Sequence, residues 1–286
     1  MTIPWSCERR SRNVIDVRVD MEGETEHWFL LSSDRHHDNV HADWSLELKH
    51  LNQARERDAG IIDIGDMHCA MQGKYDRRAD RSQLRDEYQM GNYLDRLVEV
   101  AAEFYRPFVD NFVVIGRGNH ETAIRKYHET DLTDRTCAML RQLTDKEVHS
   151  GGYGGWVRFY FHMTSTRVRR ICLKYFHGSG GGGPVTRGVI QTNRMAVFLP
   201  DAQIIATGHT HDQWLVPISR ERISNAGEIY LDEQVHVRCG TYKDEYHDGS
   251  EGWHIERGAP PKPVGAQWLR FFRDGDRVKF DITRAK

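Results

Sequence analysis

The sequence has few cysteines, and none stands at the spacing of a metal or redox motif. The five are scattered along 286 residues without a Cys-x-x-Cys pair: Cys7, Cys69, Cys137, Cys172 and Cys239. An odd, dispersed set excludes a disulfide framework and argues against a structural zinc site. It also favours a reducing compartment, so we expect a cytoplasmic protein.

Long apolar runs and an excess of one charge are also absent. No segment approaches the ~20 apolar residues of a membrane helix, and the N-terminus lacks a signal-peptide pattern, so we expect no membrane association. Lys and Arg total 40 against 42 Asp and Glu, a formal net charge of -2. This balance argues against strong non-specific attraction to nucleic acid, although a local basic patch is compatible with it.

Short apolar runs alternate with helical patterns in the first half of the chain. The runs at 28–32, 61–64 and 112–115 predict strands. Apolar residues at helical spacing predict a helix over 43–57, capped by Asp43, and another over 84–108, ended by Pro107.

The second half is richer in strand patterns. One helix is expected over 185–199, and strands at 156–162, 171–176, 203–207, 214–218, 229–237 and 268–282. Strand–helix alternation followed by many strands predicts an α/β fold, a sandwich of two mixed sheets flanked by helices. We predict one domain over residues 1–286. The Gly- and Pro-rich stretch at about 244–265 is expected to be a loop near the site, with a linker as the alternative.

Five short segments place Asp, His or Asn residues directly after apolar runs. They are Ser33-Asp34-Arg35-His36, Gly65-Asp66, Gly116-Arg117-Gly118-Asn119-His120-Glu121, His177-Gly178 and Gly208-His209-Thr210-His211. Loops at the carboxyl ends of strands share one edge of an open sheet, so one cluster can gather all five. Carboxylate oxygen and imidazole nitrogen suit manganese, iron or zinc.

The segments differ in how specific they are. Gly65-Asp66 and His177-Gly178, taken singly, are typical of ordinary turns after a strand. The segments 118–121 and 208–211 are far more specific, and the order of all five along the chain makes coincidence a poor explanation.

In this order, from Asp34 to His211, the segments resemble the calcineurin-like metallophosphoesterase superfamily. The resemblance implies a four-layer α-β-β-α sandwich and hydrolysis of phosphate esters at two divalent metal ions. Manganese is the first expectation, with iron, zinc, nickel and magnesium as alternatives. Two ions about 3.5–4 Å apart can clamp a phosphoryl group and generate a hydroxide nucleophile near neutral pH.

The resemblance also implies a role for each matching residue. The ligands of one metal are matched by Asp34, His36 and His211, and those of the other by Asn119, His177 and His209. Asp66 matches the carboxylate that bridges both metals. His120 matches the residue that contacts the phosphate and protonates the leaving oxygen, a task that suits histidine because an imidazole exchanges a proton near neutral pH.

Arginines supply the candidate substrate contacts. Arg117 stands where the phosphoprotein phosphatase branch has a phosphate-gripping arginine, and a phosphate contact and a loop salt bridge both remain open. The residues at 33–37 and 67–69 depart from that branch, and Cys69 replaces the ligating tyrosine of purple acid phosphatases. The glycines at 178–183 form either a flexible turn or a backbone cradle, with Arg187 and Arg194 on the following helix reaching an anionic substrate.

Three more polar residues follow the first motif: His37, Asp38 and His41. We expect them to support the ligands or to lie on the surface rather than to bind metal.

The leading functional hypothesis is a phosphodiesterase or nuclease. The first motif and the Gly-His-Thr-His segment resemble the branch that contains repair exonucleases and cyclic-nucleotide diesterases. The near-neutral charge favours a nucleotide or a short or single-stranded nucleic acid over a long duplex. A phosphomonoesterase or phosphoprotein phosphatase is the alternative. A non-catalytic scaffold of the same superfamily would be expected to lack ligands or His120, and this chain lacks neither. The sequence predicts no oligomeric state.

Overall fold

Two mixed sheets form the centre of the molecule. The computed structural model describes residues 3–23, 25–72, 79–181, 186, 188–247, 249–250, 253–256 and 258–286. Within these residues, a seven-stranded sheet has the order β1 (Trp5–Ser11), β2 (Val14–Asp20), β6 (Gly154–His162), β7 (Val168–Phe176), β8 (Ile204–Thr207), β10 (Ile229–Cys239) and β9 (Gln213–Ile223). The described five-stranded sheet has the order β12 (Arg277–Arg284), β11 (Gln267–Asp274), β3 (Glu26–Ser32), β4 (Gly60–Asp63) and β5 (Phe112–Ile115).

Both sheets combine parallel and antiparallel pairs. The neighbours β3, β4 and β5 run parallel in the smaller sheet, and β7, β8 and β10 run parallel in the larger one. The pairs that include β1, β9 or β12 are antiparallel, as are β6–β7 and β11–β3. The parallel strands therefore deliver several loops to the same end of each sheet.

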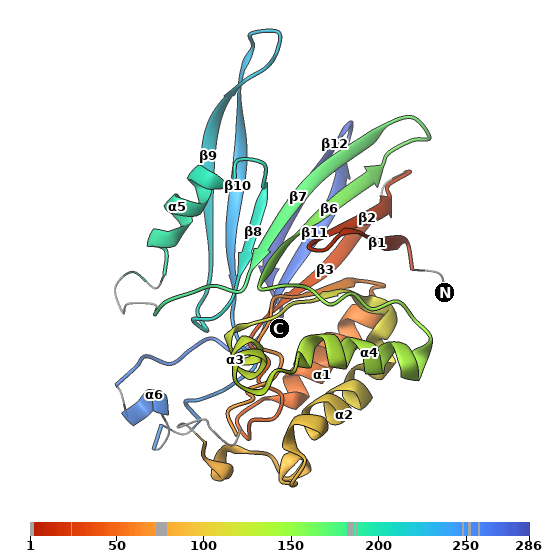
Figure 1. The fold of residues 1–286 in the computed structure, drawn as a ribbon. Coiled ribbons are helices and arrows are strands. Elements are labelled where there is room, and N and C mark those ends of the chain that lie inside the picture. The colour runs from red at the N-terminus through yellow and green to blue at the C-terminus, as the bar shows by residue number, and fades with distance from the viewer. Residues whose placement is uncertain are drawn as a thin grey trace.

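Helices lie around the two sheets, and some of them cover an outer face (Figure 1). They are α1 (Trp44–Glu56), α2 (Tyr93–Tyr105), α3 (Asn119–His128), α4 (Leu132–Thr144), α5 (Ile190–Phe198) and α6 (Trp253–Glu256), with short 3-10 turns η1 (Arg81–Gln83), η2 (Asp86–Tyr88) and η3 (Arg106–Asn111). In Figure 1, α1, α2 and α4 lie together on one side of the molecule and α5 on the other.

Three apolar layers hold this arrangement together. Between the sheets, Phe29 packs against Phe159 and Phe271, with ring centroids 4.8 and 5.8 Å away. A second cluster joins the five-stranded sheet to α1, α2, η3 and α4. On the far side, Met195 of α5 packs with Ile205 of β8. The order helix, sheet, sheet, helix confirms the predicted four-layer α-β-β-α sandwich.

Most expected elements are present, and the departures have local causes. Asp43 caps α1 as predicted, because its side chain accepts a hydrogen bond from the N–H of Leu46. The helix expected over 84–108 is shorter: it begins at Tyr93, after the 3-10 turns η1 and η2, and ends at Tyr105, because Pro107 lies in the first turn of η3. α5 begins at Ile190 rather than 185, and Val185 and Arg187 lie outside the described residues.

Several elements were not predicted from the sequence. They are the N-terminal strands β1 and β2 and the helices α3, α4 and α6, and the strand expected over 268–282 is instead the antiparallel pair β11 and β12. None of the helices in the described part of the chain has the length and apolar character needed to span a bilayer.

A buried ion network ties the first motif to the helical layer. Arg35 is fully buried, and its Nε donates to Asp63 Oδ2 at 2.6 Å while Nη1 donates to Glu47 Oε1. The Tyr105 hydroxyl also donates to Glu47, at 2.5 Å. Asp63 in turn accepts from the N–H of Gly65 at 3.0 Å, just before Asp66. Arg35 therefore links α1 and α2 to two of the loops that carry the motifs.

Removing Arg35 should destabilise the protein strongly. In Arg35→Met, two buried carboxylates lose their cation, and the expected loss is about 3–5 kcal/mol in the free energy of unfolding. Urea unfolding followed by tryptophan fluorescence measures it. The control is Arg158→Met, which removes the partly exposed ion pair with Asp16 and should cost less than about 1 kcal/mol. Equal losses in the two variants would contradict this role for Arg35.

Candidate metal centre

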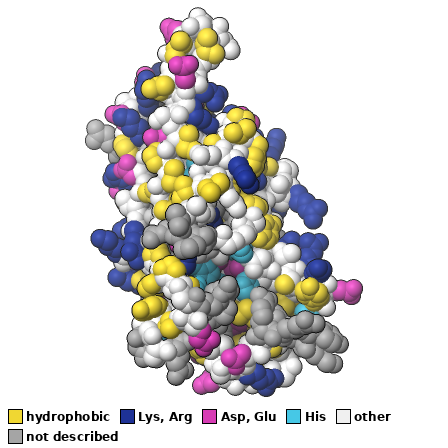
Figure 2. All heavy atoms as spheres, turned by 90° about the vertical axis from the view of Figure 1, so that its left-hand side faces the viewer, with side chains coloured by type: hydrophobic (Ala, Val, Ile, Leu, Met, Phe, Trp, Pro, Cys, Tyr) yellow, Lys and Arg dark blue, Asp and Glu magenta, His cyan; other side chains and the backbone are white. Residues whose placement is uncertain are grey.

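The five motifs meet at one end of the sandwich. The residues Asp34, Asp66 and Asn119 follow β3, β4 and β5, while His177 and His209 follow β7 and β8. The site therefore lies where the carboxyl ends of parallel strands from both sheets converge. Figure 2 shows histidine side chains within a hollow on this face of the molecule.

One group of ligand atoms consists of Asp34, His36 and His211, which lie within 4.8 Å of one another. The Nε2 atoms of His36 and His211 are 3.1 Å apart, and they lie 3.8 and 3.4 Å from Asp34 Oδ1. Asp34 Oδ1 is buried and has no hydrogen-bond partner. An unpaired carboxylate oxygen facing two imidazole nitrogens fits a divalent cation.

A second group consists of Asp66, His177 and His209, also within 4.8 Å of one another. His177 Nε2 lies 3.0 Å from Asp66 Oδ2 and 3.1 Å from Asn119 Oδ1. Asn119 Oδ1 is also 2.6 Å from His209 Nδ1. This set of oxygen and nitrogen atoms again suits a divalent ion.

The two groups are neighbours. Asp34 of the first group accepts, through Oδ2, a 2.8 Å hydrogen bond from the N–H of His209 in the second. The N–H of His36 donates to the carbonyl of Asp66 at 3.1 Å. All seven residues expected to ligate metal are thus brought together, with Asp66 and Asn119 both beside His177. That each binds an ion stays a prediction.

The backbone at the ligands is strained. Asp34, His36, Asp66, His209 and His211 all have φ between 47° and 75°. Residues with a Cβ rarely adopt this left-handed conformation, and each instance costs about 1–3 kcal/mol unless the surroundings enforce it. Such strain concentrated on the candidate ligands is typical of a functional site.

Two glycines allow the loops to approach the carboxylates closely. A Cβ added at Gly118 would lie 2.0 Å from Asp66 Oδ1, and one at Gly208 would lie 2.6 Å from Asp34 Oδ2. Any other residue at either position would push the carboxylate away. These glycines therefore belong to the site, although they carry no ligand atom.

Two supporting residues were missed by the sequence analysis. Glu121 is buried and accepts from the N–H groups of Asp66, His68 and Gly118, at 3.2, 2.9 and 2.8 Å. The signal for it was a Glu three residues after the residue that caps α3, a spacing typical of a capping box. Arg238 is buried too, and its guanidinium donates to the carbonyl of Gly208. Nothing in the sequence pattern pointed to Arg238.

Buried negative charge dominates the electrostatics of the site. Burial raises the pKa of the Glu121 carboxyl to about 8, and the nearby Asp66 adds to this effect. Burial alone would lower the pKa of His177, but Asp66 and Asp34 raise it to about 9. A protonated His177 thus supplies positive charge where a metal ion would supply more. The two buried carboxylates Asp34 and Asp66, which lie close together, favour a cation.

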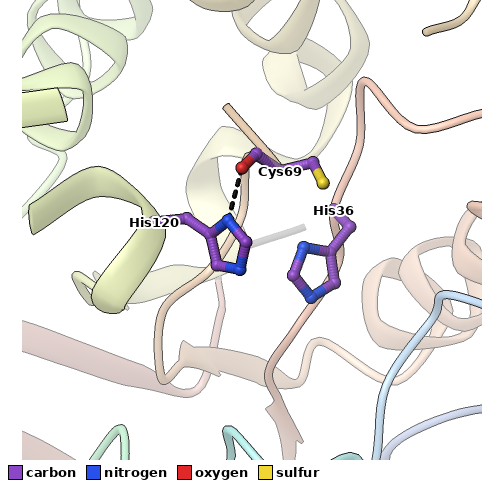
Figure 3. A group of neighbouring side chains, drawn as sticks. All are labelled: His36, Cys69 and His120. Atoms are coloured by element: carbon purple, nitrogen blue, oxygen red, sulfur yellow. Dashed lines mark hydrogen bonds between the residues drawn. The ribbon is translucent and has the colours of Figure 1, made fainter. Parts of the chain in front are cut away.

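His120 lies at the edge of both groups. Its backbone N–H donates to Asp66 Oδ1 at 2.9 Å, and its Nδ1 contacts the carbonyl oxygen of Cys69 (Figure 3). With Nδ1 donating to that carbonyl, Nε2 is left to face the site, 3.7 Å from Asp66 Oδ2. The ring is half-buried, so a substrate can reach it.

The predicted substrate-binding arginines differ in their placement. Arg117 forms a salt bridge with Asp131, the residue that caps α4. Of the two roles left open for Arg117, the structure therefore contains the salt bridge. A phosphate contact by Arg117 stays a prediction. Arg194 is exposed on α5, and Arg187 lies outside the described residues. The structure therefore gives no contact that assigns either of these two to the substrate.

Two of the residues after the first motif make buried contacts near the site, and that they support the ligands stays a prediction. Asp38 accepts from the N–H groups of Cys69 and Ala70 at 2.5 and 3.1 Å. His37 is stacked on Trp44, with ring centroids 4.3 Å apart.

The loop expected at 244–265 contacts the site through several side chains. Glu245 pairs with both Lys243 and His254, and the ring of His254 lies 6.3 Å from that of His211. Lys262 donates to Asp212 at 2.8 Å. These contacts hold parts of the loop beside the Gly208–His211 motif.

No protein-family model matches the sequence, and no curated protein matches it. Among solved structures, the chain is similar to a Zn²⁺ complex of Vps29 from Entamoeba histolytica, with 11% identity and a TM-score of 0.38 over 90% of this chain and 98% of that one. It is also similar to a predicted phosphoesterase from Streptococcus pneumoniae, with 9% identity and a TM-score of 0.34 over 92% and 91%. Vps29 from Cryptosporidium parvum is similar too, with 12% identity and a TM-score of 0.36 over 91% of this chain and 98% of that one. Similarity this low establishes neither a family nor a function.

Adding one methyl group at Gly118 should weaken metal binding. In Gly118→Ala the new Cβ displaces the Asp66 carboxylate, so we expect Mn²⁺ affinity to fall roughly 10- to 100-fold. Equilibrium dialysis with metal analysis measures the change. The matched control is Gly152→Ala, whose Cβ would sit at an ordinary 3.5 Å from the nearest atom. Unchanged Mn²⁺ affinity in Gly118→Ala would show that Asp66 does not bind the metal.

Proposed function

We propose that this protein is a metal-dependent hydrolase of phosphate esters that uses two divalent ions, most readily Mn²⁺. The observation that carries the proposal is the adjacency of two groups of three ligand atoms, with His120 at the edge of both. Carboxylates, imidazoles and one amide oxygen form a donor set that suits manganese, iron or zinc. When bound, two such ions clamp a phosphoryl group and supply a nucleophile from water near neutral pH.

The residues of the chain provide the remaining functions. Asp66 belongs to the second group, and its backbone carbonyl accepts from the N–H of His36 in the first, so its loop lies between the two groups and its carboxylate would help to hold a metal ion there. His120 is fixed by its bond to the Cys69 carbonyl, so its Nε2 can donate a proton to the departing oxygen. Glu121 and Gly118 keep the Asp66 loop in place against that ring.

For the substrate, we favour a phosphodiester of a nucleotide or of short or single-stranded nucleic acid. A cavity of about 220 Å³ lies next to the Gly208–His211 motif, and Asp212, Trp214 and Pro261 are among its lining residues. An indole beside a phosphate site can stack on a nucleobase, which contributes about 1–3 kcal/mol per base. The formal net charge of -2 does not favour a long duplex.

A phosphomonoesterase or protein phosphatase is the alternative. It would need Arg117 to leave Asp131 and grip a terminal phosphate, and the salt bridge seen here opposes that movement. A scaffold without catalysis is disfavoured because it would be expected to lack ligand residues or His120, and the sequence of this chain has all of them.

Replacing His120 should slow turnover while leaving metal binding intact. His120 contributes no atom to the two groups assigned to the metals, so His120→Ala should bind two Mn²⁺ per chain. Loss of the proton donor should lower kcat roughly 100-fold or more. The assay compares bis-para-nitrophenyl phosphate with para-nitrophenyl phosphate, and we expect the diester to be preferred.

Two control variants separate the roles in this experiment. His128→Ala changes a histidine at the far end of the same helix and should retain activity. Asp66→Ala should lose metal and activity together. A His120→Ala protein that binds no metal would contradict its role as proton donor, and preference for the monoester would favour the phosphatase alternative.

The role of Arg117 can be tested through the Michaelis constant. If Arg117 holds the phosphate, Arg117→Ala should raise KM several-fold and change kcat little. The reason is that it removes a contact made equally in the substrate complex and in the transition state. Asp131→Asn frees the guanidinium without deleting it, so KM should then fall or stay the same. A KM that rises equally in both variants would indicate a purely structural ion pair.

A further inference from the structure

A third group of candidate ligands lies on the wall of the same site. It consists of His36, Cys69 and His120, whose ligand atoms all lie within 4.8 Å of one another. Figure 3 shows the two rings facing each other beside the Cys69 side chain. The ring centroids are 5.0 Å apart and the ring planes are nearly perpendicular, at 80°. Neither group assigned to the two metals contains Cys69 or His120.

Cys69 is held firmly in this position. Asp38 accepts from its N–H at 2.5 Å and from that of Ala70 at 3.1 Å, and Ala70 is in the left-handed conformation with φ 50°. The Cys69 side chain is 3% exposed, and its Sγ lies 3.8 Å from Asn39 Nδ2. The sulfur is therefore placed by a strained, hydrogen-bonded turn rather than by a mobile loop.

Both histidines are prepared to bind an ion here. The contact between His120 Nδ1 and the carbonyl oxygen of Cys69 orients the ring, as hydrogen bonds to backbone carbonyls do for metal-binding histidines. His36 is 2% exposed, and its Nδ1 is buried without a hydrogen-bond partner. An unpaired nitrogen on a buried ring is costly in a folded protein, and a ligand would satisfy it.

The donor set differs in kind from that of the other two groups. One sulfur and two imidazole nitrogens suit soft or borderline ions such as Zn²⁺ and Cd²⁺, whereas Mn²⁺ and Mg²⁺ prefer oxygen. Among the described residues, no other cysteine belongs to a group of three such ligands.

We propose that His36, Cys69 and His120 form a binding site for a thiophilic divalent cation, Zn²⁺ or Cd²⁺, which inhibits the enzyme. The ion binds the Cys69 thiolate, and the Sγ proton passes to the buffer. Inhibition rests on the proposed function: the ion binds Nδ1 of His36, whose Nε2 faces Asp34 and His211, and it occupies the nitrogen of His120 that would protonate the leaving group. Binding of the ion itself requires only the geometry.

The test is a Cd²⁺ titration of the full-length protein loaded with Mn²⁺. A sulfur-to-cadmium charge-transfer band in the near ultraviolet reports a bond to cysteine and is independent of activity. We expect the band to grow to one Cd²⁺ per chain in the wild type and in Cys137→Ala, and to be absent from Cys69→Ala. Cys137 is a matched control because it is also fully buried, in α4, outside all three groups.

Inhibition is measured separately with Zn²⁺ and Cd²⁺, and each variant is compared with its own Mn²⁺-supported activity. The concentration that halves activity should rise at least roughly 10-fold in Cys69→Ala and not in Cys137→Ala. If Cys69→Ala fails to fold, Cys69→Ser, which keeps the size and polarity of the side chain, replaces it in both measurements.

The outcomes separate the two proposals. No band in the wild type, or a band that persists without Cys69, would overturn the site. A band that depends on Cys69, with Zn²⁺ inhibition unchanged by its loss, would overturn the inhibition. A Cys69-dependent band in a protein that hydrolyses no phosphate ester would support the ion site and reject the proposed function instead.

Discussion

Two buried carboxylates, Asp34 and Asp66, impose the constraint on which the rest of the site depends. Both are 2% exposed or less and lie where strands from the two sheets end. Burying such charges is costly unless cations and hydrogen bonds compensate. Here the N–H groups of His209 and His120 donate to them, and His177 lies 3.0 Å from Asp66. The chain supplies partial compensation, and divalent ions would complete it.

The same constraint explains the architecture around the carboxylates. Loops from both sheets must approach closely enough to donate, which requires glycine at 118 and 208 and left-handed backbone at the ligands. Their strain is balanced by rigid supports: Glu121 gathers three N–H groups, and Arg35 anchors the first loop through Asp63. Later in the chain, Thr241 and Tyr242 both donate to the carbonyl of Asp34, so the segment that leads into residues 244–265 begins at the site.

Local patterns were sufficient to predict the sandwich and the convergence of the motifs, because short stretches of sequence indicate both where a strand ends and which ligand residues follow it. The contacts that position those motifs were not predictable in this way. Arg35 reads as an ordinary loop residue until the fold brings Glu47 and Asp63 to it. Helices α3 and α4 follow the third motif in a stretch rich in polar residues, and the apolar residues on their buried faces, such as Leu132 and Leu140, were not recognised as helical spacing. Left-handed backbone at non-glycine residues leaves only a weak sequence signature, an enrichment of Asn, Asp and His that does not single out these positions.

The sequence and the structure lead to different interpretations of Cys69. In the sequence it served only to separate this chain from tyrosine-bearing relatives of the family it resembles, and the scattered cysteines argued against a zinc site. That argument applies to sites built from several cysteines close in sequence. It does not apply to a single sulfur that folding places beside two histidines. The turn that fixes Cys69 also fixes His120, since the carbonyl of the one residue contacts the ring of the other. Because the backbone carbonyl of residue 69 orients the ring of His120, the side chain at that position lies beside the site, and in this chain it is a thiol.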